Sequence, residues 1–199
     1  IDFRGGTQIQ LDFQQRPDTV RRGDLLGPFS GRAVDAGTGK PVAGALVYVS
    51  WEFVRGIGFV VPAGAHTWSG KTDSDGQYTV PRLASLPSGA TRAVARVRLV
   101  IYKRGFVAYR SDRVFPGDLQ RHDFRQYENN AVLERWSPEL SHAAHLRFVG
   151  GDGPLAKATA WEVQSAVAQI EGRPIGKPAK PRPGAGERLL DGSDLLDED

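Results

Sequence analysis

Residues 31–50 read GRAVDAGTGKPVAGALVYVS, and this stretch decides the fold. Apolar side chains alternate with polar or small ones before Asp35 and again after Gly44, which is the period-two pattern of half-buried strands. Between the two segments, Gly-Thr-Gly at 37–39 lets the chain reverse, and Pro41 fixes φ ahead of the second segment. The stretch therefore predicts a β-hairpin.

Short alternating segments separated by turn residues continue to about residue 135, which is the pattern of an all-β domain. We expect strands near 28–35, 44–53, 67–72, 77–80, 93–103, 106–115 and 121–134. Between the second and the third strand lies VRGIGFVVPAGAH (54–66), which is apolar, rich in glycine and longer than a tight hairpin needs. We call it the flap, and expect it to be packed down or to bind a partner.

The character of the chain changes at residue 136. Ser137-Pro138-Glu139 indicates the start of a helix, and residues 155–171 form the strongest helical pattern, ending at Gly172. The three- and four-residue spacing predicts which positions of this helix face inward: Leu155, Thr159, Val163, Val167 and Ile170. Residues 173–199 are rich in Pro and Gly and then acidic, so we expect them to be extended or disordered unless a partner holds them.

Three pieces of the chain carry a family resemblance. They are GRAVDAGTGKPVAGALV from Gly31, TDSDGQYTV from Thr72 and RLVIYKRGF from Arg98. In this order and spacing they resemble the carboxypeptidase regulatory-like module. The resemblance implies a mainly-β fold, a transthyretin-like seven-stranded antiparallel β-sandwich, over about residues 28–135. The expected organisation is an N-terminal arm (1–26), this β-sandwich (27–135), a short helical extension (136–172) and the tail (173–199).

Composition excludes several classes of site. The 199 residues include no cysteine, so disulfides, thiolate zinc sites and cysteine nucleophiles are absent. No run of 18 apolar residues exists that would span a membrane. The chain also has no methionine, so Ile1 is not a translational start. We expect either that a secretory signal peptide has been removed or that the chain is truncated.

The same hairpin raises one enzymatic hypothesis. The transthyretin-like hydrolase that opens 5-hydroxyisourate has a similar hairpin, with a catalytic His three residues before the Asp that aligns with Asp35. Arg32 stands at that position here. A guanidinium stays protonated at neutral pH and cannot act as a general base, so the resemblance does not favour this activity.

Other candidate chemistry is sparse. His142 and His145 have the i, i+3 spacing of a helical metal pair, with Glu139 or His122 as a third ligand, but surface histidines at this spacing are more common. Asp73 and Asp75 lack the bidentate Glu that closes a calcium loop. The chain has neither a Gly-x-Ser-x-Gly elbow nor a phosphate-binding loop. We expect no cofactor, no metal and no catalytic residue.

The candidate partner-binding residues lie in three places. The flap offers Phe59, Val60 and Val61, and the arginine-rich segment 92–113 offers a basic face. The tail carries six acidic residues between 187 and 199. On that face we single out Arg96, Arg98 and Arg110, and in the tail the paired leucines Leu189, Leu190, Leu195 and Leu196. The face suits other protein subunits, anionic glycan or lipid head groups. Without a recognition helix or an aromatic platform we expect no nucleic acid.

These features predict a non-catalytic accessory subunit of an extracytoplasmic multiprotein assembly, in the bacterial periplasm or cell envelope or secreted. It would dock through sheet edges, the flap and the tail. The alternative is a carbohydrate-binding or enzyme-targeting module, in which exposed faces of Trp51 and Trp68 would stack on sugar. A transthyretin-like hydrolase is third, because of Arg32.

Overall fold

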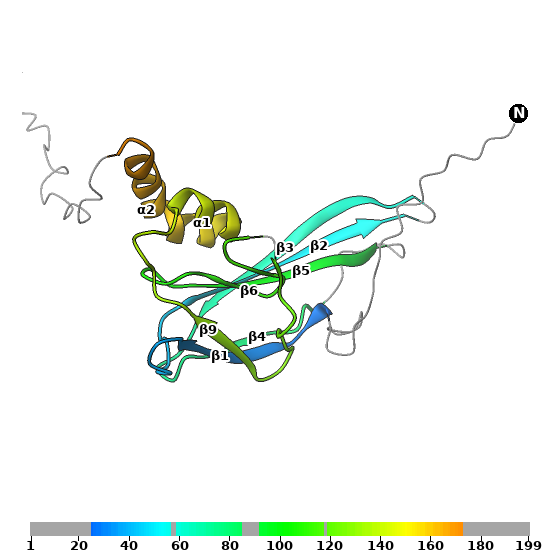
Figure 1. Cartoon of the computed structure of the whole chain (residues 1–199). Coiled ribbons are helices and arrows are strands. Elements are labelled where there is room, and N and C mark those ends of the chain that lie inside the picture. Colours follow the sequence, from blue (N-terminus) through cyan, green and yellow to red (C-terminus); the bar gives the residue numbers. More distant parts are fainter. Residues whose placement is uncertain (1–24, 57–58, 85–91, 118, 173–199) are drawn as a thin grey trace, which may run out of the picture.

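The computed structural model of the chain describes residues 25–56, 59–84, 92–117 and 119–172. Within these residues the fold is mainly β, with two helices near the C-terminal end (Figure 1). The elements are β1 (Phe29–Asp35), β2 (Leu46–Arg55), β3 (Val61–Lys71), β4 (Gln77–Val80), β5 (Arg92–Tyr102), β6 (Tyr109–Arg110), β7 (Arg113–Val114), β8 (Leu119–Gln120), β9 (Asn129–Leu133), α1 (His142–Val149) and α2 (Gly153–Ile170).

The strands form two main sheets and one short hairpin. The larger sheet has the order β3-β2-β5-β6 and is antiparallel throughout. The smaller sheet has the order β4-β1-β9, in which β1 pairs antiparallel with β4 and parallel with β9. The strands β7 and β8 pair only with each other among the described residues. In Figure 1 the larger sheet lies between the smaller sheet and the helices.

The main core fills the space between the two sheets. Alternate residues of β2 point into it, and so do Leu99 and Ile101 of β5. From the smaller sheet come Phe29, Ala33 and Leu133, which are at most 1% exposed. The period-two alternation of β1 and β2 thus has the expected cause, since one face of each strand enters this core. The predicted hairpin between them is wrong: the chain reverses after Asp35, with one isolated bridge between Val34 and Pro41, and β2 then joins the other sheet.

A second core lies on the opposite face of the larger sheet. Tyr48 of β2, with Val100 and Tyr102 of β5, packs there against Phe148 of α1 and Leu155 of α2. Both faces of the central strands β2 and β5 are therefore covered, which explains the unbroken burial of residues 47–51 and 99–102. The helices act as a third layer and hide much of the face that alternation alone assigns to solvent.

The flap is shorter than the sequence predicts. Its second half belongs to β3, which begins at Val61 and continues to Lys71 in register with β2. Most of β3 is exposed, so it shows little of the alternation that marks a half-buried strand. The expected strands at 106–115 and 121–134 are also reduced, to the two-residue strands β6 and β7 and to β9.

The helices differ from the prediction in their start and in their phase. Helix α1 begins at His142 rather than near Ser137, and Ser141 caps it by accepting a hydrogen bond from the backbone of Ala144 at 3.2 Å. In α2 the predicted inward positions are right for Leu155 and Thr159 and wrong for three others: Val163, Val167 and Ile170 are 52%, 47% and 79% exposed. The buried positions are Leu155, Thr159, Glu162, Ser165 and Ala166.

Candidate functional site

The three apolar flap residues lie at the tip of the β2–β3 hairpin. Phe59 is 90% exposed, Val60 is 51% exposed and Val61, the first residue of β3, is 46% exposed. Large apolar side chains exposed side by side on a surface mark a site of interaction when they form a continuous group. The hairpin holds them at one end of the larger sheet, beyond the first residue of β1 in Figure 1.

The edge of the larger sheet runs away from this tip along β3. Among the described strands, β3 pairs only with β2, so its other side presents backbone N–H and C=O groups over 11 residues. Such an edge can accept an additional strand from another chain. Tip and edge are continuous because Val61 belongs to both.

A groove lies on the inner side of the same edge. The larger sheet overhangs the smaller one beyond the short strand β4, and the open space there measures about 450 Å³. Its walls come from the inner face of β2 and β3 and from the segment after β4: Trp51, Phe53, His66, Trp68, Pro81, Arg82, Leu83 and Ala84. The groove was not apparent from the sequence, because its walls come from three segments that are separate in the chain.

The two tryptophans differ from the surface pair that sugar stacking requires. Trp51 is 1% exposed, and its indole Nε1 donates a hydrogen bond to the backbone oxygen of Leu25 at 2.8 Å. Trp68 is half-buried and packs against the main core. Trp51 therefore has no open face on which a sugar ring could stack, and the carbohydrate hypothesis loses one of its two platforms.

The basic face is divided by the helices. Arg96 is exposed, as expected, and Arg98 is half-buried, since its guanidinium lies near Gly150 at the end of α1. The Nε of Arg98 is buried without a hydrogen-bond partner. The alternation of β5 places both side chains on one face correctly, but this is the face on which α1 and α2 pack.

Arg110 is a correction to the predicted set. It is 7% exposed and forms a bidentate ion pair with Asp112, in which Nε donates to Oδ1 at 2.8 Å and Nη2 donates to Oδ2 at 2.6 Å. Its Nη1 donates to the backbone oxygen of Phe148, next to the last residue of α1. Arg110 therefore joins β6 to the C-terminal end of α1, where a cation is favoured, and is not available to a partner. Leu189, Leu190, Leu195 and Leu196 lie outside the described residues.

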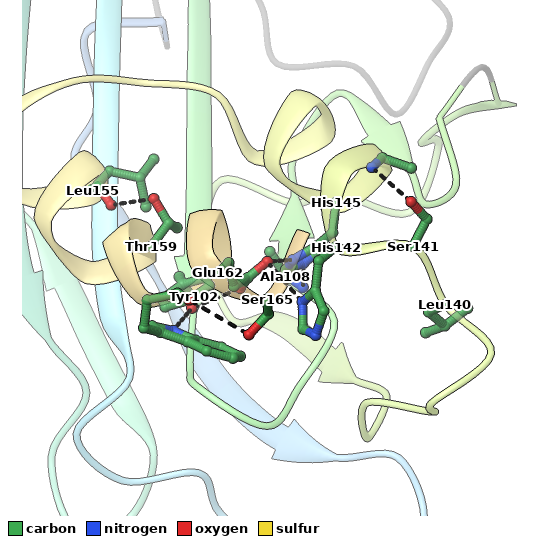
Figure 2. Close-up of polar contacts among 12 residues, drawn as sticks. Tyr102, Ala108, Leu140, Ser141, His142, His145, Leu155, Thr159, Glu162 and Ser165 are labelled. Atoms are coloured by element: carbon green, nitrogen blue, oxygen red, sulfur yellow. Dashed lines mark hydrogen bonds and ion pairs between the residues drawn. The ribbon is translucent and has the colours of Figure 1, made fainter. Parts of the chain in front are cut away.

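The predicted histidine pair belongs to a buried polar cluster instead of the surface. Figure 2 shows His145 of α1, Glu162 of α2 and Tyr102 of β5 pointing toward one another. Glu162 Oε2 accepts a hydrogen bond from His145 Nδ1 at 2.8 Å, and Glu162 Oε1 accepts one from the Tyr102 hydroxyl at 2.7 Å. All three residues are at most 3% exposed. Trp161 Nε1 donates in turn to the Tyr102 oxygen at 2.7 Å.

The tautomer of His145 follows from its neighbours. The backbone N–H of Ala108 donates to His145 Nε2 at 2.9 Å, so that nitrogen carries no proton and Nδ1 carries the one donated to Glu162. Both ring nitrogens are thus occupied. A metal ion would have to displace one of these bonds, so His145 is a poor ligand as it stands.

His142 lies beside the cluster but is not hydrogen-bonded to Glu162. It is 3% exposed and stacks on Trp136 with ring centroids 4.3 Å apart. Its Nδ1 lies 3.6 Å from Glu162 Oε2, too far for a hydrogen bond, and has no other partner among the described residues. Among the described residues, no three His, Asp or Glu side chains gather so as to hold a metal ion. Glu139 and His122, the expected third ligands, are both exposed.

Burial and hydrogen bonding set the charges in this cluster. Burial raises the pKa of Glu162, but the bonds from His145 and Tyr102 outweigh it, and the pKa is held below its usual range. Burial lowers the pKa of His142, against the pull of the Glu162 carboxylate. The cluster therefore holds an ionised Glu162 beside a neutral His142. Every polar atom of Glu162 points at the protein, so the arrangement fastens the helices to the sheet rather than facing a substrate.

The turn after β1 is also held by hydrogen bonds and an ion pair. Asp35 Oδ1 accepts from the backbone N–H of Gly37 at 2.8 Å, and Oδ2 forms an ion pair with Arg135 at 2.7 Å. The bond from Arg135 lowers the pKa of Asp35. Arg32 donates from Nε to the backbone oxygen of Asp75 at 2.9 Å. Asp35 and Arg32, which align with the hydrolase motif, therefore stabilise local structure. Asp35 bonds the turn at Gly37 and Arg135 after β9, and Arg32 bonds the turn at Asp75.

Comparison with known proteins adds little. No protein-family model and no curated protein matches the chain. Among solved structures, a 9R-lipoxygenase from Cyanothece PCC8801 matches at 13% sequence identity and a TM-score of 0.26, over 79% of this chain. The chain covers only 25% of that lipoxygenase chain, and a TM-score this low supports no conclusion about fold or activity. None of the helices in the described residues is long and apolar enough to cross a membrane.

Proposed function

We propose that this chain is a non-catalytic binding subunit that recruits a protein partner along the β3 edge and the hairpin tip. The observation that carries the proposal is the continuity between an open edge of 11 residues and three exposed apolar side chains at its start. A partner strand added to β3 would gain backbone hydrogen bonds from the edge, while Phe59, Val60 and Val61 would supply apolar contact.

The proposal extends to the family and the location. The GRAVDAGTGKPVAGALV piece falls on β1, the turn after it and the start of β2. The TDSDGQYTV piece falls on the turn before β4 and on β4 itself, and the RLVIYKRGF piece on the end of β5 and its turn. These placements, together with a three-stranded and a four-stranded sheet around one core, support a carboxypeptidase regulatory-like module with a transthyretin-like seven-stranded β-sandwich. We propose an extracytoplasmic location on this resemblance. Recovery of the chain in the cytoplasmic fraction of its native cells would contradict it.

The test is isolation of the complex from native cells that express a tagged chain. We compare the wild-type chain with the triple variant Phe59→Ser, Val60→Ser, Val61→Ser. The matched control is Leu119→Ser, Tyr127→Ser, Val132→Ser, whose parent side chains are 72%, 55% and 46% exposed elsewhere on the surface. We expect defined partner subunits with the wild-type chain and the control, and their loss with the tip variant.

Two results would count against the proposal. Recovery of only the free 21.7 kDa chain from gently lysed cells would exclude an accessory subunit. Recovery of the same partners with the tip variant would leave the subunit role intact and remove the tip from the contact, which would then lie at the β3 edge alone, at Arg96 or at the tail leucines. Hydrogen exchange then separates the cases, because a strand added to β3 slows exchange of its outward amides.

A further inference from the structure

The groove lies directly beneath the free edge of β3. On this side its wall is made by His66 and Trp68, which lie on the inner face of the strand: His66 contacts the ring of Trp51, and Trp68 packs against the main core. The six-membered ring of Trp68 lies over Gly70, where an added Cβ would come within 2.5 Å of the ring. Because Gly70 leaves this space to the indole, the wall is formed before any partner binds.

The opposite wall is the segment that follows β4. The backbone N–H of Leu83 donates to the backbone oxygen of Leu26 at 2.8 Å, and Nη1 of Arg82 donates to the backbone oxygen of Gly27 at 2.6 Å. These bonds hold the segment in place, and Leu83 and Ala84 give the wall an apolar part. The space of about 450 Å³ between the two walls is within the range of sites that bind ligands.

A strand added to β3 would place every second side chain in this groove. Successive side chains of a strand point to opposite faces of the sheet, so the inward residues of the partner would lie beside His66 and Trp68. Its outward residues would lie beside Thr67, Ser69 and Lys71, which are exposed and polar. A strand complementary to both faces is therefore amphipathic, with apolar side chains inward and polar side chains outward.

Positive charge gathers at the end of the groove nearer the tip. Arg55 of β2 pairs directly with Arg92 of β5, and the alternation of β2 puts both on the same face as Phe53, which lines the groove. No hydrogen bond or ion pair joins the side chain of Arg55 or Arg92 to another described residue. Like charges directly opposite one another destabilise a pair of strands, and an anion between them relieves the repulsion. Arg82 adds a cation in the wall itself, so the groove favours a carboxylate as well as an apolar group.

We propose that the partner strand on β3 is amphipathic and acidic, with an aromatic or aliphatic side chain in the groove and a carboxylate toward the tip. The apolar side chain lies between Trp68 and Leu83. The carboxylate, two residues away on the same face of the strand, lies near Arg55 and Arg92. This inference rests on the proposed function, because it describes the strand that β3 recruits. The backbone bonds of the edge accept any strand, whereas the groove gives the interface its sequence preference.

NMR titration of the ¹⁵N-labelled full chain with synthetic peptides tests the inference. The probe is the capped peptide Thr-Glu-Thr-Phe-Thr-Glu-Thr, whose Phe and Glu share one face and which presents a Glu toward the tip in either strand direction. One control peptide has Lys in place of both Glu, and the other, Thr-Glu-Phe-Thr-Thr-Glu-Thr, has Phe on the opposite face. We expect the probe to shift the amide signals of β3 and to bind roughly tenfold more tightly than either control.

Variants of the chain assign the contacts. Arg55 is exposed, and Arg55→Gln should remove most of the preference for the Glu peptide over the Lys peptide. Leu83→Ser should weaken binding of the probe by roughly tenfold through the loss of apolar contact. Arg147→Gln, at an exposed position of α1, is the control and should change neither result. The amide spectrum verifies that each variant is folded. Equal binding of the Glu and Lys peptides, or signal shifts confined to other parts of the chain, overturns the inference.

Two combined results separate the acidic strand from the proposed function. If the native partners are lost with the tip variant but the peptides show no preference, recruitment at the tip stands and the acidic strand is wrong. If the probe binds in the groove but no partner is recovered from native cells, the chemistry of the groove stands and the subunit role is wrong.

Discussion

The hydroxyl of Tyr102, the last residue of the inner strand β5, donates to Glu162 on α2 at 2.7 Å, and this bond joins the larger sheet to the middle of the longer helix. A parallel link lies one strand away, where the hydroxyl of Tyr48 on β2 donates to Asp152, the residue before α2, at 2.5 Å. Burial and this carboxylate raise the pKa of Tyr48 to about 12. The helix is held at two points by tyrosine hydroxyls of neighbouring strands.

The first prediction concerns Glu162→Gln. The amide keeps the shape of the side chain but must direct its NH₂ group toward either Tyr102 or His145, both of which donate to Glu162 in the native protein. A buried donor then loses its acceptor, at a cost of about 1–3 kcal/mol in the free energy of unfolding. Urea unfolding measures it. Gln164→Glu, the reverse change at an exposed position of the same helix, should shift the midpoint little, and an equal loss in both variants would contradict the assigned role of the cluster.

The second prediction is the pH dependence of stability. The pKa values of His142 and Glu162 are both depressed in the folded chain, so the unfolded chain binds more protons in acid. Each contribution is complete above the pKa of the unfolded group and is lost as the pH falls below it. The free energy of unfolding should therefore decline below about pH 6.5 through His142, and further below about pH 4.3 through Glu162.

Two histidine variants separate this effect from general acid sensitivity. In His142→Gln, the decline between pH 6.5 and 5 should flatten, since the group that gains a proton on unfolding is removed. His122 is exposed, and His122→Gln should leave the curve parallel to that of the wild type. The measurement is chemical unfolding at half-unit intervals of pH. A curve for His142→Gln with unchanged slope in this interval would show that His142 is not the titrating group.

The third prediction concerns Arg110→Lys. Lysine keeps the charge but cannot donate to both oxygens of Asp112 and also to the backbone oxygen of Phe148, as the guanidinium does. We expect a loss of about 1.5–3 kcal/mol in the free energy of unfolding, because hydrogen bonds to charged groups are the stronger class. Arg113→Lys is the control, since the side chain of Arg113 is 52% exposed and approaches Asp112 only to 4.0 Å. Equal effects of the two changes would contradict the proposed tie between β6 and α1.

The fourth prediction concerns Gly31→Ala on β1. A Cβ there would lie 2.2 Å from the backbone oxygen of Asn129 on β9 and 2.7 Å from the Tyr78 hydroxyl. One of the two strands must move, with a cost of about 1–3 kcal/mol. At Gly37 in the hairpin turn, the nearest atom to an added Cβ is 3.4 Å away, so Gly37→Ala should be nearly neutral. Thermal unfolding compares the two, and a neutral Gly31→Ala would mean that β9 does not approach β1 this closely.

The strands that sequence reasoning placed well are those with one face in the main core. The alternation around Ala33 and along β2 reports burial directly, so both strands follow from local pattern, but the predicted hairpin is wrong because β1 and β2 belong to different sheets. Strand β3 was predicted only in its second half, near 67–72, for the opposite reason. It is exposed over most of its length and contains Pro62 and Gly64, so its strand conformation depends on pairing with β2.

Helix α2 was located correctly, but its orientation about its own axis was not. Leucine, valine and isoleucine at 155, 163, 167 and 170 define an apolar side that a sequence pattern assigns to the interior. The chain instead buries Glu162, because Tyr102 and His145 satisfy its carboxylate from 60 and 17 residues away in the sequence. Local spacing cannot report partners at such distances, and a charged residue is ordinarily assigned to solvent.

The parallel pairing of β1 with β9 has a consequence for how the chain is made. Asp35, at the end of β1, contacts Arg135, just after β9, and these residues are 100 positions apart in the sequence. During translation β1 emerges long before the strand that covers its second edge. Contacts so remote in sequence slow folding, since a long loop must close before they form. Until then the uncovered edge of β1 can pair with other nascent chains. The yield of folded protein should therefore fall as the local concentration of nascent chains rises.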